Sequence, residues 1–189
     1  NKPPRPIAGT DEIMSSDEIS QAAAILGELP VGFVPPLLFR QFARLAVLPS
    51  FVVVPLFRRN SETYVRLTQR DMGDPDYPGQ WHPPGTVIRP TDETLQACFE
   101  RLARSELPEM TVIGGPVFFD IAFTQIIRGR ELSLLHWVEI TDDNTPDCFP
   151  VGDLPRATID TDMPRIEGAA THFAQTRMSC AGTVANPKP

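Results

Sequence analysis

The 189-residue sequence contains few cysteines, a shortage of basic residues and no long apolar run. Its three cysteines are far apart and odd in number, so neither a disulfide framework nor metal-ligand spacing is present, which favours a reducing compartment. Seventeen Lys and Arg face 24 Asp and Glu, which argues against nucleic-acid binding. The most apolar stretch, residues 43–57, is broken by Pro49 and Pro55, and no secretory segment is evident. We therefore expect a cytoplasmic protein that binds neither nucleic acid nor membrane.

Hydrophobic periodicity divides the chain into an N-terminal arm with helices (1–46), a main domain (47–175) and a C-terminal tail (176–189). Helical spacing predicts helices over 16–26, 36–46, 92–106 and 164–173. β-branched or alternating runs predict strands over 51–57, 63–68, 117–127 and 132–140. Strands, a central helix, further strands and a closing helix indicate a mixed sheet covered by helices, an α/β (α+β) sandwich.

The helix predicted over 92–106 places a carboxylate on its apolar face. Leu95, Cys98, Phe99 and Leu102 share one side of the helical wheel, and Glu106 follows Leu102 by four residues. A buried carboxylate is costly unless it is paired or binds a cation. Spacing alone leaves a second interpretation open, in which Glu106 reaches water at a frayed helix end before Pro108.

The loop and helix together resemble a Nudix box, whose usual form is Gly, then Glu, then Arg-Glu-hydrophobic-x-Glu-Glu. The matching residues are Gly85, Glu93, Arg101 and Glu106. Leu102, Ser105 and Thr86 replace two box glutamates and the second loop glycine, and the loop is one residue longer than usual. The resemblance implies a Nudix-type α/β/α sandwich, and the lost glutamates remove carboxylates that hold Mg²⁺ in that family.

A reduced box of this kind resembles the GDP-mannose mannosyl hydrolase branch of the superfamily. The matching runs are Asp92-Glu93-Thr94-Leu95, Phe99-Glu100-Arg101-Leu102 and Glu106-Leu107. A looser resemblance extends over about residues 39–173. Members of this branch are commonly dimers, so a homodimer is one expectation.

This resemblance implies roles for individual residues. Gly85 and Glu106 match the positions that hold one Mg²⁺ (or Mn²⁺), and Arg70 matches an arginine that contacts the diphosphate and supports catalysis. His82, at the mouth of the loop, and Arg89, near the box, are further candidates for substrate binding. For Arg70 the alternative is an exposed loop arginine.

Two departures from the branch leave catalysis open. Val87 stands where the branch has a second arginine, and the loop over residues 141–147 lacks the histidine that the branch uses there. Asp142 or Asp143 could act as base or ligand instead, because carboxylates can do either, although a solvated acidic loop explains them equally. The sequence therefore predicts a Mg²⁺-dependent hydrolase of a nucleoside-diphosphate sugar or related derivative. The alternative is an inactive Nudix-fold protein that binds a nucleotide or a protein.

Overall fold

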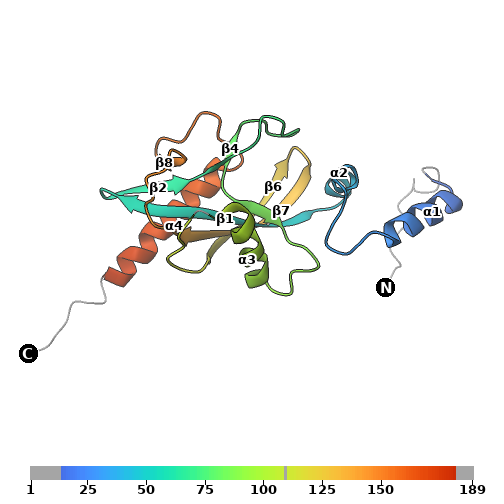
Figure 1. Ribbon diagram of the computed structural model, residues 1–189, viewed down its shortest axis with the longest axis horizontal. Helices are drawn as coiled ribbons and strands as arrows, with labels where there is room; N and C mark the ends of the chain where they lie inside the picture. Colours follow the sequence, from blue (N-terminus) through green and yellow to red (C-terminus); the bar gives the residue numbers. More distant parts are fainter. Residues whose placement is uncertain (1–13, 109, 182–189) are drawn as a thin grey trace, which may run out of the picture.

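A computed structural model describes residues 14–108 and 110–181 (Figure 1). Residues 1–13, at the start of the predicted N-terminal arm, and residues 182–189 of the predicted tail lie outside this range. The elements are α1 (Ser16–Gly27), α2 (Pro36–Leu45), β1 (Leu48–Arg59), β2 (Glu62–Arg66), β3 (Thr68–Gln69), β4 (Trp81–His82), β5 (Gly85–Val87), α3 (Leu95–Glu106), β6 (Val117–Ile126), β7 (Gly129–Glu139), β8 (Cys148–Pro150) and α4 (Met163–Ala181).

The main sheet is mixed, as the sequence predicted. Its strands run in the order β6-β7-β1-β2-β8, and β5 pairs with β1 outside this path. β1 and β7 are parallel, whereas the β1–β2, β1–β5, β2–β8 and β6–β7 pairs are antiparallel. β3 and β4 form a separate two-stranded sheet that carries the loop ahead of β5.

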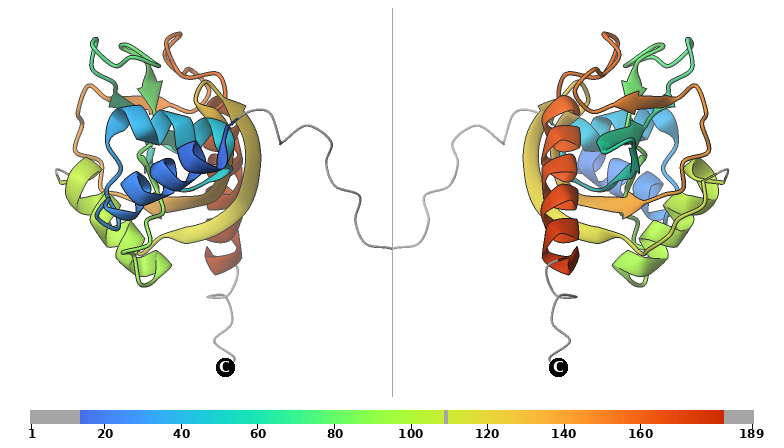
Figure 2. Two further views of the ribbon diagram at one scale, coloured as in Figure 1. Left: turned by 90° about the vertical axis from the view of Figure 1, so that its right-hand side faces the viewer. Right: turned by 90° about the vertical axis from the view of Figure 1, so that its left-hand side faces the viewer.

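Two helices cover the sheet from opposite sides (Figure 2). On the α3 side, Cys98, Phe99 and Leu102 pack against Phe51 and Val53 of β1. On the α4 side, the core gathers apolar residues of β1, β2, β7 and α4, namely Val54, Leu56, Val65, Trp137, Ile166, Ala169 and Phe173. This α/β/α arrangement confirms the predicted fold class.

Several predicted boundaries were wrong, each for a local reason. α3 begins at Leu95 rather than 92, because the Thr94 side chain accepts from the Ala97 N–H and caps the helix. Leu95 is consequently on the first turn and 48% exposed, outside the core face where the wheel had placed it. α4 continues to Ala181, past the predicted end at 173 and into the predicted tail.

The two N-terminal helices differ in their contacts with the main sheet. α2 packs against β7, and Gly129 lies so close that a Cβ there would come within 1.9 Å of the Ala43 carbonyl oxygen. α1 has no buried residue and projects away from the sheet (Figure 1). Within the described residues, no helix has the length and apolarity needed to cross a membrane.

Candidate functional site

A cavity of about 520 Å³ opens beside β5 and the end of α3. Its lining includes five of the residues that the sequence proposed for metal or substrate binding: Arg70, His82, Gly85, Arg89 and Glu106. Arg70 follows β3, His82 ends β4, Gly85 begins β5 and Glu106 ends α3. The small β3–β4 sheet and the α3 C-terminus thus bring residues distant in sequence to one hollow.

Glu106 points into this cavity from the last turn of α3. Its Oε2 accepts a hydrogen bond from the Gly85 N–H at 3.3 Å. Burial raises the pKa of Glu106, while that hydrogen bond and the charge of Arg70 act in the opposite direction. Glu106 is therefore a partly buried carboxylate, and the only protein hydrogen bond described for it is one backbone N–H, which leaves oxygen lone pairs for a cation.

Arg70 is the central positive charge of the cavity. Its Nη1 donates to Asp74 Oδ2 at 3.0 Å, and its guanidinium lies 5.7 Å from the centre of the Tyr77 ring. Its charge influences Glu106, His82 and Asp162, which all line the same cavity. Arg70 is thus a cavity residue, and the exposed-loop interpretation does not describe its position.

Hydrogen-bond donors without an acceptor line the same cavity. Among the described residues, the Nε atoms of Arg70, Arg128 and Arg165 are buried without a hydrogen-bond acceptor, and all three arginines line the cavity. Unsatisfied buried donors cost about 1–3 kcal/mol each. Arginine forks suit phosphate oxygens, so this concentration of unpaired donors fits an oxyanion ligand.

The box arginine has a structural task. Arg101 donates to both carboxylate oxygens of Asp92, at 2.8 and 2.6 Å, to Thr86 Oγ1 at 2.8 Å and to the Val87 carbonyl at 3.0 Å. It therefore clamps the box loop onto α3. The hydrogen bond from Arg101 is the main cause that holds the pKa of Asp92 well below its usual range.

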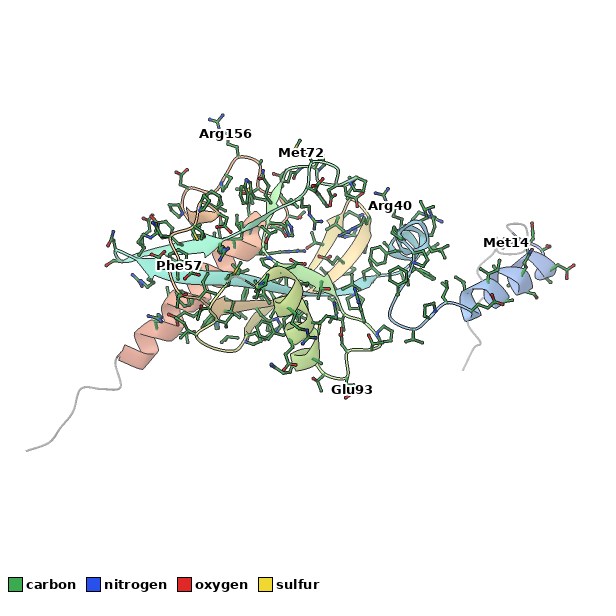
Figure 3. The ribbon with its side chains drawn as sticks, in the orientation of Figure 1. Met14, Arg40, Phe57, Met72, Glu93 and Arg156 are labelled. Atoms are coloured by element: carbon green, nitrogen blue, oxygen red, sulfur yellow. The ribbon has the colours of Figure 1, made fainter. Side chains whose placement is uncertain are left out.

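Glu93, matched to the first box glutamate by sequence, does not take part in this clamp. Its side chain is exposed and points away from the body (Figure 3). Glu93 precedes α3, so the predicted position in the first helical turn was wrong. Asp92, one residue earlier, supplies the carboxylate that Arg101 binds, which is consistent with the lengthened loop.

His82 is buried and neutral at physiological pH. Burial is the main cause that lowers its pKa to about 4, and the charge of Arg70 adds to this. Its Nδ1 lies 2.8 Å from the Pro83 carbonyl, which can only accept, so Nδ1 carries the proton. His82 can consequently accept a hydrogen bond from a ligand at Nε2, and it brings no charge.

Sequence reasoning missed a buried charged cluster in the cavity wall. Arg165 Nη2 donates to Glu131 at 3.0 Å and Arg165 Nη1 to Asp162 at 3.0 Å, while Ser133 Oγ donates to Glu131 at 2.7 Å. Burial raises the pKa of Asp162 to about 6. One signal was available: Glu131 and Ser133 are two residues apart and therefore share one face of β7, where both are buried.

The structure does not bring Asp142 and Asp143 to the cavity. Asp142 pairs with Arg59, and Asp143 lies 3.9 Å from Arg66, which also binds Asp147 at 2.7 Å. None of these carboxylates lines the cavity. In this conformation the acidic loop is tied to the β1–β2 hairpin.

The cavity residues fit a divalent cation only together with a phosphorylated ligand. No group of three or more acidic, His or Cys side chains that could hold a metal occurs within the described residues. Mg²⁺ is commonly held by one or two carboxylates plus substrate phosphates, which Glu106 can satisfy. Four arginines against five carboxylates line the cavity, a formal balance of −1, so a diphosphate there would need added positive charge.

Comparison with known proteins shows the fold. No protein-family model matches the sequence, and no curated protein matches it. A mutT/nudix family protein from Listeria innocua superposes with a TM-score of 0.54 and 13% identity, covering 69% of this chain and 96% of that one. The NUDIX domain of Shewanella oneidensis NrtR, solved with ADP ribose, gives 0.52 and 17%, covering 80% and 97%. A C. elegans Ap4A hydrolase gives 0.50 and 10%, covering 68% and 99%. The chain therefore has the Nudix fold.

Proposed function

We propose that the chain is a Mg²⁺-dependent Nudix-type hydrolase of a nucleoside-diphosphate derivative. The observation that carries this proposal is the meeting of Glu106, Gly85 and Arg70 in one cavity rich in unpaired arginine donors. Those residues match the reduced box of GDP-mannose mannosyl hydrolases, and a fold neighbour was solved with ADP ribose. A nucleoside-diphosphate sugar is accordingly the substrate class that we propose.

Each cavity residue has a task in this proposal. Arg70 binds diphosphate oxygens through its guanidinium and offsets charge on the leaving group. Glu106, with the Gly85 carbonyl, would hold Mg²⁺ (or Mn²⁺), which when bound neutralises phosphate charge and orients the diphosphate. Arg89 lines the cavity close to Val87, which stands where the branch has its second arginine, and adds a further contact to the diphosphate. His82 is neutral and brings no charge to the site.

We place the proton acceptor at Asp162 rather than in the acidic loop. Asp162 lines the cavity, and its raised pKa of about 6 leaves it ionised at neutral pH yet more basic than an ordinary aspartate. Asp142 and Asp143 could serve only if their loop left Arg59 and Arg66. Substitution of Asp162 by Asn should therefore lower turnover more than substitution of Asp142 or Asp143.

The test is a screen of GDP-mannose, ADP-ribose and related compounds with Mg²⁺ and with Mn²⁺. Free sugar plus nucleoside diphosphate would indicate attack at carbon, whereas nucleoside monophosphate would indicate attack at phosphorus. Arg70→Ala should abolish turnover, and Arg104→Ala, on the exposed side of α3, should not. Absence of every product across the screen would refute the hydrolase proposal.

The alternative function is binding of a nucleotide without turnover. Val87 in place of an arginine and the lack of a preformed acidic metal cluster in the described chain favour it. Saturable binding of a screened compound with no product after long incubation would select this alternative. We retain the cytoplasm as the proposed location in either case.

A further inference from the structure

A second cavity, of about 610 Å³, borders the first, and its size is typical of sites that bind small molecules. The residues that line both cavities are Tyr77, Ile126, Ile159 and Thr161. The residues that line the second cavity alone include Gln80, Ile127, Thr158 and Asp160. Arg70 and Glu106, in contrast, line the first cavity alone. We refer to the second cavity as the side cavity.

Hydrogen bonds join the segments that surround the side cavity. The Trp81 N–H donates to the Ala157 carbonyl at 2.9 Å, and the Ile159 N–H donates to the Trp81 carbonyl at 3.0 Å. The Ile127 N–H, just past β6, donates to the Tyr77 hydroxyl at 3.2 Å. The loop ahead of α4 is thus held against β4, and the β6–β7 turn is held against the loop between β3 and β4. A preformed cavity of this kind binds a ligand with little loss of protein conformational freedom.

The charges of the side cavity do not suit a phosphate group. Its charged lining residues are Asp76, Asp160 and Arg156. Arg156 is exposed and points away from the body (Figure 3), and Asp76 is bound by Arg40 at 2.7 Å. The first cavity contains four arginines, so phosphate oxygens fit there instead. The side cavity therefore fits an uncharged part of the ligand.

Several uncharged polar groups of the side cavity are free to bind a ligand. Gln80 and Thr161 are half-buried, and their side chains make no hydrogen bond to the part of the chain that the structure describes. Thr158 is 4% exposed, and its Oγ1 has no partner there either. Gln125 Nε2 donates to two backbone carbonyls at 3.0 Å, which fixes the amide and leaves its Oε1 able to accept. The side cavity thus offers both donors and acceptors.

Apolar side chains make up the rest of this lining. They are Ile126, Ile127 and Ile159, together with Ala157 and the aromatic residue Tyr77. A nucleobase is flat, with two apolar faces and its heteroatoms confined to the edge, so it matches apolar and aromatic surface interspersed with amides and hydroxyls. A hexose carries hydroxyls around its ring and would leave several of them against isoleucine without a hydrogen bond, which is costly.

We infer that the side cavity binds the base of the nucleotide, while the diphosphate lies in the first cavity at Arg70. Tyr77 and Thr161, which line both cavities, then lie beside the ribose that connects the two groups. The group on the other side of the diphosphate stays in the first cavity with Asp162. This inference rests on the proposed function for its class of ligand, a nucleoside-diphosphate derivative.

Calorimetry with matched ligands tests this inference and requires binding rather than turnover. A nucleoside 5′-monophosphate differs from ribose 5-phosphate chiefly in its base, so the ratio of the two affinities measures recognition of the base. The tightest of AMP, GMP, CMP and UMP should bind the wild type about tenfold or more tightly than ribose 5-phosphate. Gln80→Ala and Ile127→Ser change the side cavity alone and should each lower this ratio by about 3–10-fold. Gln96→Ala and Ile113→Ser, outside both linings, are the controls and should retain it.

Two further ligands separate the side cavity from the first cavity. Pyrophosphate with Mg²⁺ should bind Gln80→Ala and Ile127→Ser as tightly as it binds the wild type, because these variants leave the first cavity intact. A parallel loss of pyrophosphate affinity would overturn the inference, since the variants would then act on the whole site. A selective loss of affinity for mannose 1-phosphate would overturn it by assigning the side cavity to the sugar.

The inference and the hydrolase proposal can fail separately. Equal affinity of the wild type for ribose 5-phosphate and every nucleoside monophosphate, or an unchanged ratio in both variants, would overturn the base site even if a nucleotide sugar is hydrolysed. If the ratio falls in Gln80→Ala and Ile127→Ser while no compound is turned over, the base site is supported and only hydrolysis is refuted.

Discussion

At the scale of single residues, three nearby carboxylates have three different environments. Asp92 is bound by Arg101, Glu93 is exposed to solvent, and Glu106 is partly buried beside Gly85 in the cavity. Only Glu106 combines burial with unused acceptor capacity, and its pKa is raised chiefly by burial. The folded state therefore bears a cost for the ionised carboxylate at neutral pH, which a cation would offset.

The Glu106→Gln substitution tests this assignment. Gln keeps the shape and can still accept from the Gly85 N–H, but it removes the charge. Because the folded-state pKa is raised, the stabilisation from this group is present at low pH and lost as the pH rises. The variant should therefore equal or exceed wild-type stability at neutral pH without metal, and this gain should disappear in acid. Mn²⁺ affinity with nucleotide present should fall by roughly 100-fold or more.

Calorimetry of Mn²⁺ binding with GDP-mannose or ADP-ribose measures the affinity, and chemical denaturation measures the stability. Glu100→Gln, on the exposed side of the same helix, is the matched control and should change neither quantity. Equal Mn²⁺ affinity in wild type and Glu106→Gln would remove Glu106 from the metal site and favour the binding protein.

His82 makes the stability of the fold sensitive to acid. Its folded-state pKa of about 4 lies below the value of 6.5 for a free histidine, so the unfolded chain takes up the proton first. The stabilisation that neutral His82 gives the folded state is fully present above pH 6.5 and is lost as the pH falls toward 4. Relative to His82→Asn, which can still donate to Pro83, the wild type should lose about 2 kcal/mol between pH 8 and pH 5. Urea denaturation of both proteins at the two pH values measures this, and parallel pH profiles would contradict it.

At the scale of elements, periodicity predicted the central helix and the long strands, because their apolar residues pack in the cores on the two sides of the sheet. The pattern Cys98, Phe99 and Leu102 identified the buried side of α3. Helix ends were less predictable, since Thr91, Asp92 and Thr94 could each cap α3. Only the side-chain bond of Thr94 in three dimensions selects among them.

Residue spacing alone was informative about the site where its residues lie in one local motif. Gly85, Arg101 and Glu106 belong to a loop and helix that are continuous in sequence, so their spacing carries information. Glu131 and Arg165 meet across 34 residues and two elements, and no short pattern links them. The Arg101–Asp92 clamp likewise required the observed loop path, because the sequence match pointed to Glu93.

The contact between α2 and β7 depends on a glycine. Gly129 has φ of 145°, a value that other residues rarely adopt, and a Cβ would meet the backbone of Ala43 at 1.9 Å. Gly129→Ala should therefore displace α2 and destabilise the fold by about 2–4 kcal/mol in urea denaturation. Gly152→Ala is the control, because a Cβ there meets no atom within 4 Å. Equal stability of the two variants would show that α2 does not depend on this close approach.

At the scale of the whole molecule, electrostatics disfavours an anionic ligand unless it brings a cation. The chain has a net charge of −7, and the cavity lining has a formal balance of −1. Arg70 and Arg165 already bind carboxylates, which reduces the charge they offer to phosphate. A nucleoside diphosphate and a divalent cation should therefore bind together better than either binds alone, a positive coupling between the two ligands.

Thermal unfolding with four ligand conditions measures this coupling. Mg²⁺ alone and a nucleoside-diphosphate sugar alone should each raise the Tm slightly, while both together should raise it by more than the sum of the separate shifts. A coupling of about 1–3 kcal/mol, corresponding to a 5–150-fold change in affinity, is the expected size. Arg104→Ala should retain the coupling, whereas Glu106→Gln should lose it because the nucleotide then binds without its cation. If the two ligands together raise the wild-type Tm only by the sum of their separate shifts, the cavity binds the diphosphate through its arginines alone. The metal would then not be part of the site.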